Sequence, residues 1–272
     1  MRGRGSIGLM RMPAAVVMPA DRPQRAVLIT AAGPQMQQVL EEISLPAFNW
    51  YAARWGYHVE ATTLARDGAG ADHAAQRAKW QKIRLLREAL TRYDVAVWFD
   101  ADVLVLRDDE DVAGHLHPHH FQSFALEQVP AEHRVNPNTG VWVLRSCASA
   151  FAFLDAVEAQ GPQPGPWADQ GAVLAALGWD RGDDAYHWAG PGLGSAYLRR
   201  TSWLPSSWNQ PYVGPRSPTD SYNSDPASYA DRPTVSRPHA VHFMGLTPEA
   251  RYRYMAAAAL EDAARSDLYA IS

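Results

Sequence analysis

The chain has 272 residues, of which 47% are hydrophobic and 20% charged, a composition ordinary for a globular protein with one large domain or two small ones. Its net charge of −4, with no basic stripe, argues against nucleic acid as a partner. The single cysteine, Cys147, rules out an intrachain disulfide, and no apolar run approaches the ~20 residues that span a bilayer. We therefore expect a soluble, cytoplasmic protein.

Strand and helix patterns alternate along the N-terminal third. After a leader over 1–24, which prolines and arginines break up and which we expect to be disordered, residues 26–30 form an apolar run typical of a strand. Helical spacing follows from Met36, and a second helical stretch ends at Gly56, where a C-cap glycine is expected. A strand over 57–62 and a helix over 79–92 complete the alternation. The order predicts an α/β protein with a mostly parallel central sheet flanked by helices.

The most informative segment follows that helix. Residues 95–99 are apolar without alternation, as in a parallel strand buried on both faces, and Asp100 and Asp102 stand at its carboxyl end. Side chains at i and i+2 of an extended chain point the same way, so the two carboxylates converge. A hard divalent cation, Mg²⁺ or Mn²⁺, is their natural partner at a sheet edge where α/β proteins bind ligands.

Two other interpretations of this segment remain open on the residues alone. Asp100 could cap the strand and Asp102 could open a solvated turn, because so short a motif also occurs by chance. The motif also resembles that of haloacid-dehalogenase phosphatases, in which the first Asp is a nucleophile. That family usually has Thr or Val where this chain has Leu104, and its motif usually lies near the N-terminus.

The rest of the chain is less regular. Residues 107–111 are typical of a turn and an acidic helix start, 121–127 and 140–144 of strands, and 148–159 and 169–177 of helices. The segment 212–238 is rich in proline and nearly free of aliphatic residues, as in a long functional loop. Residues 248–267 form an alanine-rich helical pattern.

Further motifs occur in one order along residues 26 to 246. They are Asn-x-Tyr-Ala-x-Arg-x-Gly-Tyr at 49–57, Trp-x-Lys-Ile at 80–83, Asn-x-Gly-Val at 138–141, Asp-Gln at 169–170, Leu-Pro-x-x-Trp-Asn at 204–209 and His-x-x-Gly at 242–245. Together with the two aspartates they resemble the galactosyl/xylosyl/mannosyl-transferase family related to fungal α-galactosyltransferases. They also resemble the related glycogenin-like and lipopolysaccharide galactosyltransferase families.

The resemblance implies a GT-A fold and a retaining transfer of a hexose from a nucleotide sugar, with a UDP-sugar as the expected donor and an acceptor that the sequence does not name. It implies that Asp100, Asp102 and His242 hold Mn²⁺ (or Mg²⁺), and that Asp169 and Gln170 flank the reacting carbon. The implied donor-binding residues are Thr30, Ala31, Lys82, Arg84, Asp100, Ala101, Asn138, Thr139, Gly140, Asp169, Gln170 and Gly245.

One departure concerns the diphosphate. Related galactosyltransferases have a lysine shortly after His-x-x-Gly, whereas this chain continues from Leu246 to Glu249 without one. Arg251 or Arg253 could replace it if the chain folds back.

The resulting division of the chain is a leader, a catalytic domain over 25–247 and a C-terminal helix over 248–272. The donor half of the domain covers about 25–145 and the acceptor half about 146–247. The alternatives to a transferase are a Mg²⁺-dependent phosphatase with Asp100 as nucleophile, and a non-catalytic protein that only binds a nucleotide sugar.

Overall fold

The computed structural model describes residues 25–64, 71–129, 134–161, 163, 167–181, 188–214, 217–221 and 232–270. The leader expected over 1–24 lies outside these residues, as does the central part of the proline-rich segment. Within the described part, no helix combines the length and the apolar character needed to cross a bilayer.

A six-stranded mixed sheet forms the centre of the molecule, in the order β2-β1-β3-β6-β5-β9. β1, β2 and β3 are parallel, while β6 runs antiparallel to both of its neighbours, so five of these six strands point the same way. The prediction of a mostly parallel sheet is confirmed. The strands are β1 (Ala26–Ala32), β2 (His58–Thr63), β3 (Val95–Phe99), β5 (Gln122–Val129), β6 (Arg134–Arg145) and β9 (Thr201–Leu204).

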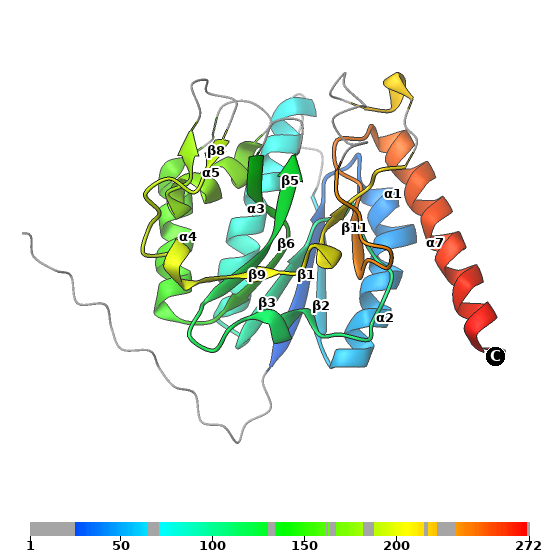
Figure 1. Ribbon diagram of the computed structural model, residues 1–272, viewed down its shortest axis with the longest axis horizontal. Coiled ribbons are helices and arrows are strands. Elements are labelled where there is room, and N and C mark those ends of the chain that lie inside the picture. The colour runs from blue at the N-terminus through cyan, green and yellow to red at the C-terminus, as the bar shows by residue number, and fades with distance from the viewer. Residues whose placement is uncertain are drawn as a thin grey trace, which may run out of the picture.

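Helices cover both faces of this sheet, which explains why all five residues of β3 are buried. In Figure 1 the helices α3, α4 and α5 lie on one side of the sheet, and α1, α2 and α7 lie on the other. Two apolar clusters, one on each face, form the core. The helical elements on the two faces include α1 (Gln37–Val39), the π-helical turn η1 (Leu40–Ser44), α2 (Leu45–Trp55), α3 (Ala71–Leu90), α4 (Ala148–Gln160) and α5 (Ala168–Leu177).

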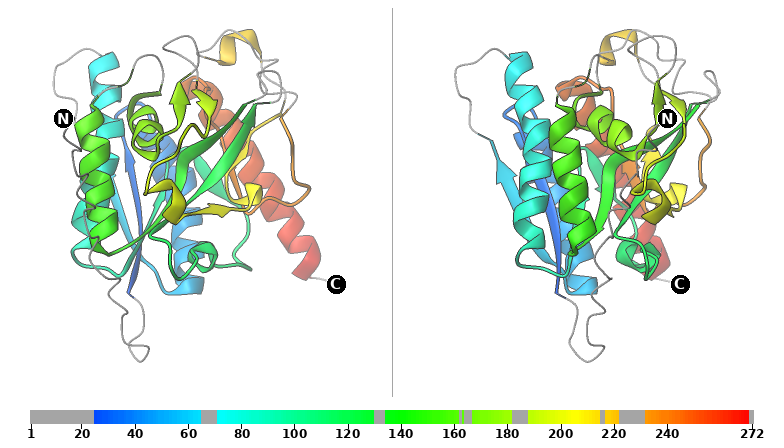
Figure 2. Two further views of the ribbon diagram at one scale, coloured as in Figure 1. Left: turned by 60° about the vertical axis from the view of Figure 1, so that its left-hand side comes forward. Right: turned by 90° about the vertical axis from the view of Figure 1, so that its left-hand side faces the viewer.

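A second, three-stranded sheet in the order β10-β11-β4 adjoins the first, and the long helix α7 packs beside it through Ala250 and Met255. Figure 2 shows α7 on the side of the molecule away from α3 and α4. The elements are β4 (Val103–Val105), β10 (Gln210–Pro211), β11 (Ala240–His242) and α7 (Pro248–Ala270). The remaining short elements are β7 (Asp180–Arg181), β8 (Trp188–Gly190), and the 3-10 turns η2 (Val112–His115), η5 (Leu198–Arg200), η6 (Ser206–Trp208) and η7 (Pro218–Asp220).

Most predicted elements occur close to their expected positions. Gly56 ends α2 with a left-handed φ of 72°, as expected of a C-cap glycine. Asp111 caps the 3-10 turn η2 by accepting a hydrogen bond from the Ala113 N–H at 3.1 Å. The α3 helix begins earlier than predicted, at Ala71, because the prediction relied on apolar spacing, which starts further along the chain.

Candidate metal and donor site

Asp100 and Asp102 lie in the turn where the chain leaves the large sheet at the end of β3 and enters the small sheet at β4. Backbone bonds to both sheets fix this turn. The Asp100 N–H donates to the Gly140 carbonyl at 2.8 Å, and the Phe243 N–H donates to the Asp102 carbonyl at 2.9 Å. Between them, the Ala101 carbonyl accepts a 2.7 Å hydrogen bond from the buried hydroxyl of Ser44, the last residue of the π-helical turn. The two carboxylates therefore start from a rigid backbone.

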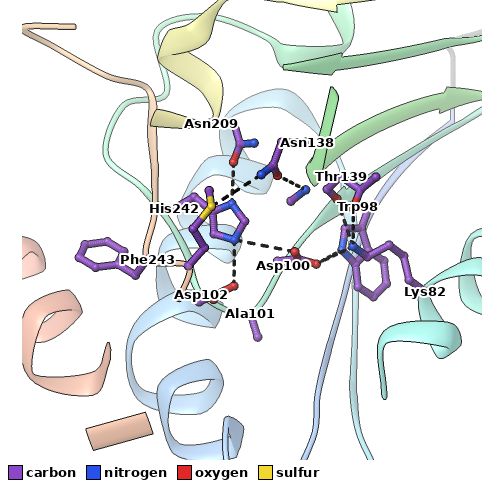
Figure 3. A network of polar contacts seen from close by, with 12 residues as sticks. Lys82, Trp98, Asp100, Ala101, Asp102, Asn138, Thr139, Asn209, His242 and Phe243 are labelled. Atoms are coloured by element: carbon purple, nitrogen blue, oxygen red, sulfur yellow. Dashed lines mark hydrogen bonds and ion pairs between the residues drawn. The ribbon is translucent and has the colours of Figure 1, made fainter. Parts of the chain in front are cut away.

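His242 meets the two carboxylates from the small sheet, because it ends β11 and pairs with Val103 of β4. Its Nε2 atom lies 3.3 Å from Oδ1 of Asp102 and 3.8 Å from Oδ2 of Asp100. These three ligand atoms lie within 4.8 Å of one another, and among the described residues they form the one such group of acidic, histidine or cysteine side chains. Figure 3 shows the imidazole facing both aspartates.

The donor set suits a divalent metal ion. Nδ1 of His242 lies 3.0 Å from the Asn209 side-chain oxygen, which can only accept, so Nδ1 carries a proton and Nε2 is the nitrogen that faces the aspartates and could bind a metal ion after losing its own proton. Two carboxylate oxygens with one imidazole nitrogen match Mn²⁺ better than Mg²⁺, which prefers an all-oxygen shell. Asn209 thus orients His242, a role that the sequence did not indicate.

Charge coupling among these groups is strong. Burial alone would raise the pKa of Asp102, but the neighbouring cations Arg251 and His242 outweigh burial and hold that pKa well below its usual range. Burial disfavours the protonated form of His242, but the two aspartates outweigh burial and raise its pKa. A metal cation among the three groups would replace the proton that this raised pKa retains.

Lys82 of α3 holds the other side of Asp100. Its buried ammonium lies 2.9 Å from Oδ1 of Asp100 and 3.0 Å from Oδ2 of Asp169, and donates to the carbonyl and hydroxyl of Thr139, each at 3.2 Å. Burial by itself would lower the pKa of Lys82, but the two carboxylates raise it, so the lysine remains charged. The Trp98 indole N–H donates to the same Asp100 oxygen at 2.6 Å. Only Oδ2 of Asp100 is therefore left to face His242 (Figure 3).

Asn138 stands behind His242 with its amide engaged by the protein. Its NH₂ group donates to Glu127 at 2.7 Å, and its oxygen accepts from the Gly140 N–H at 2.8 Å. Glu127 is also paired with Arg232, whose side chain is buried, and the Glu127 side chain itself is 10% exposed. Sequence reasoning missed Glu127, because nothing in its local pattern distinguishes it from a surface carboxylate. The geometry favours Asn138 as a support for the metal site.

Gly140 is required for this packing, and its replacement gives a direct test. A Cβ atom at position 140 would overlap the imidazole of His242, so Gly140→Ala should displace the third ligand. We expect a loss of stability of about 1–3 kcal/mol from overpacking, together with loss of Mn²⁺ binding in a titration with UDP present. Gly114→Ala is the matched control, since a Cβ there meets nothing within 4 Å. Unaltered Mn²⁺ affinity in Gly140→Ala would contradict the assignment of His242 as a ligand.

The remaining donor-binding candidates from the sequence are Thr30, Ala31, Arg84, Gln170 and Gly245. Thr30 is fully buried at the end of β1, and its hydroxyl has no hydrogen-bond partner among the described residues. Arg84 is about half exposed and pairs with Glu88 on its own helix, so the structure brings Lys82 and not Arg84 to the aspartates. Ala31 is half-buried near the end of β1, Gln170 is partly exposed beside Asp169 in α5, and Gly245 follows β11 with a φ of 73°.

The two arginines that could replace the missing lysine have different partners. Arg251 lies at the site, with Nε 3.1 Å from Oδ2 of Asp102. Arg253 instead points to Asp220, with a nitrogen 2.8 Å from that carboxylate. Two positions apart on a helix differ by about 200°, so only one of the two could face the metal site.

Fold comparison places the chain among structures of glycosyltransferases. No family model matches the chain, and no curated protein matches its sequence. The crystal structure of a glycosyltransferase involved in the glycosylation of the major capsid of PBCV-1 matches with a TM-score of 0.52 and 14% identity, over 85% of this chain and 98% of that one. At this identity the match establishes similarity of fold, and the fold is that of the GT-A glycosyltransferases.

Two further matches have lower scores. The galactosyltransferase LgtC, solved with donor and acceptor sugar analogs, matches with a TM-score of 0.43 and 15% identity, over 85% of this chain and 95% of LgtC. Mouse xyloside xylosyltransferase 1 matches with a TM-score of 0.39 and 12% identity, over 81% of this chain and 98% of that one.

Proposed function

We propose that this protein is a metal-dependent glycosyltransferase that moves a hexose from a UDP-hexose to an acceptor hydroxyl with retention of the anomeric configuration. One observation carries the proposal. Asp100, Asp102 and His242 bring three ligand atoms within 4.8 Å of one another at the carboxyl end of β3, the edge at which α/β sheets bind ligands. They do so in a fold that a solved glycosyltransferase shares.

In the proposed reaction the bond from the anomeric carbon to the diphosphate oxygen breaks, the acceptor oxygen bonds to that carbon, and the acceptor proton passes to a diphosphate oxygen. A bound Mn²⁺ (or Mg²⁺) would supply Lewis-acid neutralisation of the departing diphosphate. Asp100 and Asp102 would each offer one carboxylate oxygen to it, and His242 its Nε2.

The remaining roles follow from where each side chain lies. Lys82 keeps Asp100 oriented and adds a fixed positive charge beside the site. Asp169 is 4% exposed and pairs with Lys82, which supports a role in orienting that ammonium more than a role as a covalent nucleophile. Gln170 is its partly exposed neighbour and is proposed to contact the donor sugar. Thr30 and Ala31 are proposed to line the nucleoside pocket, and Thr139, Gly140 and Gly245 the rest of the donor site.

A donor panel tests the proposal. We expect UDP-sugars, but not GDP-, ADP- or dTDP-sugars, to raise the melting temperature in the presence of Mn²⁺ and to lose this effect in EDTA. At 100 times the dissociation constant, linkage gives about 2.7 kcal/mol, or a rise of roughly 5–10 °C for a chain of this size. The anomer of the sugar released by slow donor hydrolysis, followed by NMR, reports retention or inversion.

Other outcomes identify the alternatives. Binding of a UDP-sugar with neither hydrolysis nor transfer would mean a non-catalytic binding protein. A flat response to every donor, with stabilisation by beryllium fluoride and Mg²⁺, would mean a phosphatase with Asp100 as nucleophile. The contacts of Asp100 favour a ligand over a nucleophile, because Trp98 and Lys82 already share one of its oxygens and the other faces His242.

A further inference from the structure

Arg251 links the C-terminal helix to the metal site. The residue lies in the first turn of α7, where its N–H donates to the Thr247 carbonyl at 2.9 Å, while the Thr247 hydroxyl accepts from Ala250. Its side chain is 11% exposed, and Nε lies 3.1 Å from Oδ2 of Asp102 and donates to the Phe243 carbonyl at 3.0 Å. The guanidinium is therefore held in one place by backbone as well as by the carboxylate.

The two aspartates are treated alike by the protein. In each of them one oxygen pairs with a buried cation: Lys82 contacts Oδ1 of Asp100, and Arg251 contacts Oδ2 of Asp102. The oxygens that remain, Oδ2 of Asp100 and Oδ1 of Asp102, are the two that face Nε2 of His242. Each aspartate is thus restricted to a single free oxygen, and the direction of that oxygen is set by a buried cation on the other side.

The same cations nearly cancel the charge of the site. Three carboxylates (Asp100, Asp102 and Asp169) lie in direct contact with two permanent cations, Lys82 and Arg251. A divalent ion arriving alone meets only a small excess of negative charge and two nearby like charges, which weakens its binding. A diphosphate bound at the same time would supply the missing negative charge. This step rests on the proposed function, which provides the diphosphate.

We propose that Arg251 is a positioning residue that fixes Asp102 as a one-oxygen ligand and offsets its charge, so that the metal ion binds tightly only together with the diphosphate of the donor. The C-terminal helix is on this view a part of the metal site. This assigns Arg251 to Asp102 and not to the role of the missing phosphate-binding lysine, since Nε contacts Asp102 and the Phe243 carbonyl and Nη1 contacts the sulfur of Met36.

The test is the affinity for Mn²⁺, measured by electron paramagnetic resonance of the free ion on the full chain, with and without UDP. For the unaltered protein we expect weak binding of Mn²⁺ alone and at least tenfold tighter binding with UDP. For Arg251→Gln we expect Mn²⁺ alone to bind about tenfold tighter than in the unaltered protein, since a like charge has been removed. The effect of UDP should shrink accordingly.

Two further variants separate charge from structure. Arg251→Lys keeps the charge and should retain the weak binding of Mn²⁺ alone and the effect of UDP. Arg253→Gln removes the neighbouring arginine, which is exposed and paired with Asp220, and should behave like the unaltered protein in both measurements.

The outcomes that overturn the inference are distinct from those that overturn the proposed function. Tight binding of Mn²⁺ alone to the unaltered protein would refute the charge balance, even if Arg251→Gln does not fold. So would an Arg251→Gln variant whose affinity for Mn²⁺ alone is unchanged or weaker. Failure of the unaltered protein to bind Mn²⁺ under either condition would instead refute the proposed metal-dependent function.

Discussion

Asp102→Asn is expected to abolish metal-dependent donor binding, with an affinity loss of more than about 100-fold, beyond the range usual for residues that only support a metal ligand. The guanidinium of Arg251 lies against Oδ2 of Asp102, with Nε at 3.1 Å, so the introduced amide should turn its oxygen toward Arg251 and its NH₂ group toward His242. The metal would then face a donor group in place of a ligand oxygen. Calorimetric titration of UDP in the presence of Mn²⁺ measures the loss.

Asp109→Asn is the matched control for that experiment. Asp109 lies in the segment that follows β4, and its side chain is 57% exposed and paired with Arg107. Its neutralisation changes the net charge by the same amount without touching the site, so donor binding should be preserved. If Asp102→Asn binds the donor as well as Asp109→Asn does, the metal assignment is wrong.

Lys82→Met should give the second large effect, a loss of stability of about 3–5 kcal/mol, as expected when one partner of a buried ion pair is removed. The methionine fills a similar volume but leaves Asp169, which is 4% exposed, without its cation, and leaves Asp100 with only the Trp98 indole on that oxygen. Urea unfolding at an unchanged m-value measures the loss. Donor binding should fall as well, because Asp100 is then free to rotate.

Arg84→Met provides the comparison on the same helix. Arg84 is about half exposed and pairs with Glu88, so its loss should change stability by no more than about 0.5 kcal/mol. The double variant Lys82→Met with Asp169→Asn should be less destabilised than the sum of its parts, because the second change removes the charge that the first leaves unpaired. Equal stabilities of Lys82→Met and Arg84→Met would refute the buried network.

The parts of the fold that the sequence predicted well are those that local pattern determines. The strand over 95–99 follows from five consecutive apolar residues, and the end of α2 at Gly56 follows from the freedom of glycine at positive φ. The sequence does not predict that β6 runs antiparallel to its neighbours. A strand buries the same side chains in either direction, and only the path of the connecting chain decides between the two. The π-helical turn that brings Ser44 to the Ala101 carbonyl has no recognisable sequence pattern, so it was not predicted either.

The residues of the candidate site likewise differ in whether local sequence could predict them. Asp100 and Asp102 could be proposed from their position after a buried strand, whereas His242 was proposed only through a family resemblance, since no spacing relates it to them. The choice of Arg251 over Arg253 depends on the rotation of α7 against the small sheet, which apolar packing at Ala250 and Met255 sets. Asn209 ends one of the family motifs, but its contact with His242 is tertiary, so the motif did not indicate its role, and no sequence signal marked Glu127.

The pairing of β4 with β11 has a consequence for the order of folding. It joins segments separated by about half of the 272-residue chain, and loop-closure entropy makes contacts of such high contact order slow to form. β1, β2 and β3 can pair, and α3 can pack on them, before β11 has left the ribosome. Because His242 and Arg251 arrive with β11 and α7, we expect a nascent chain to acquire the capacity to bind metal and donor last, after its large sheet has formed.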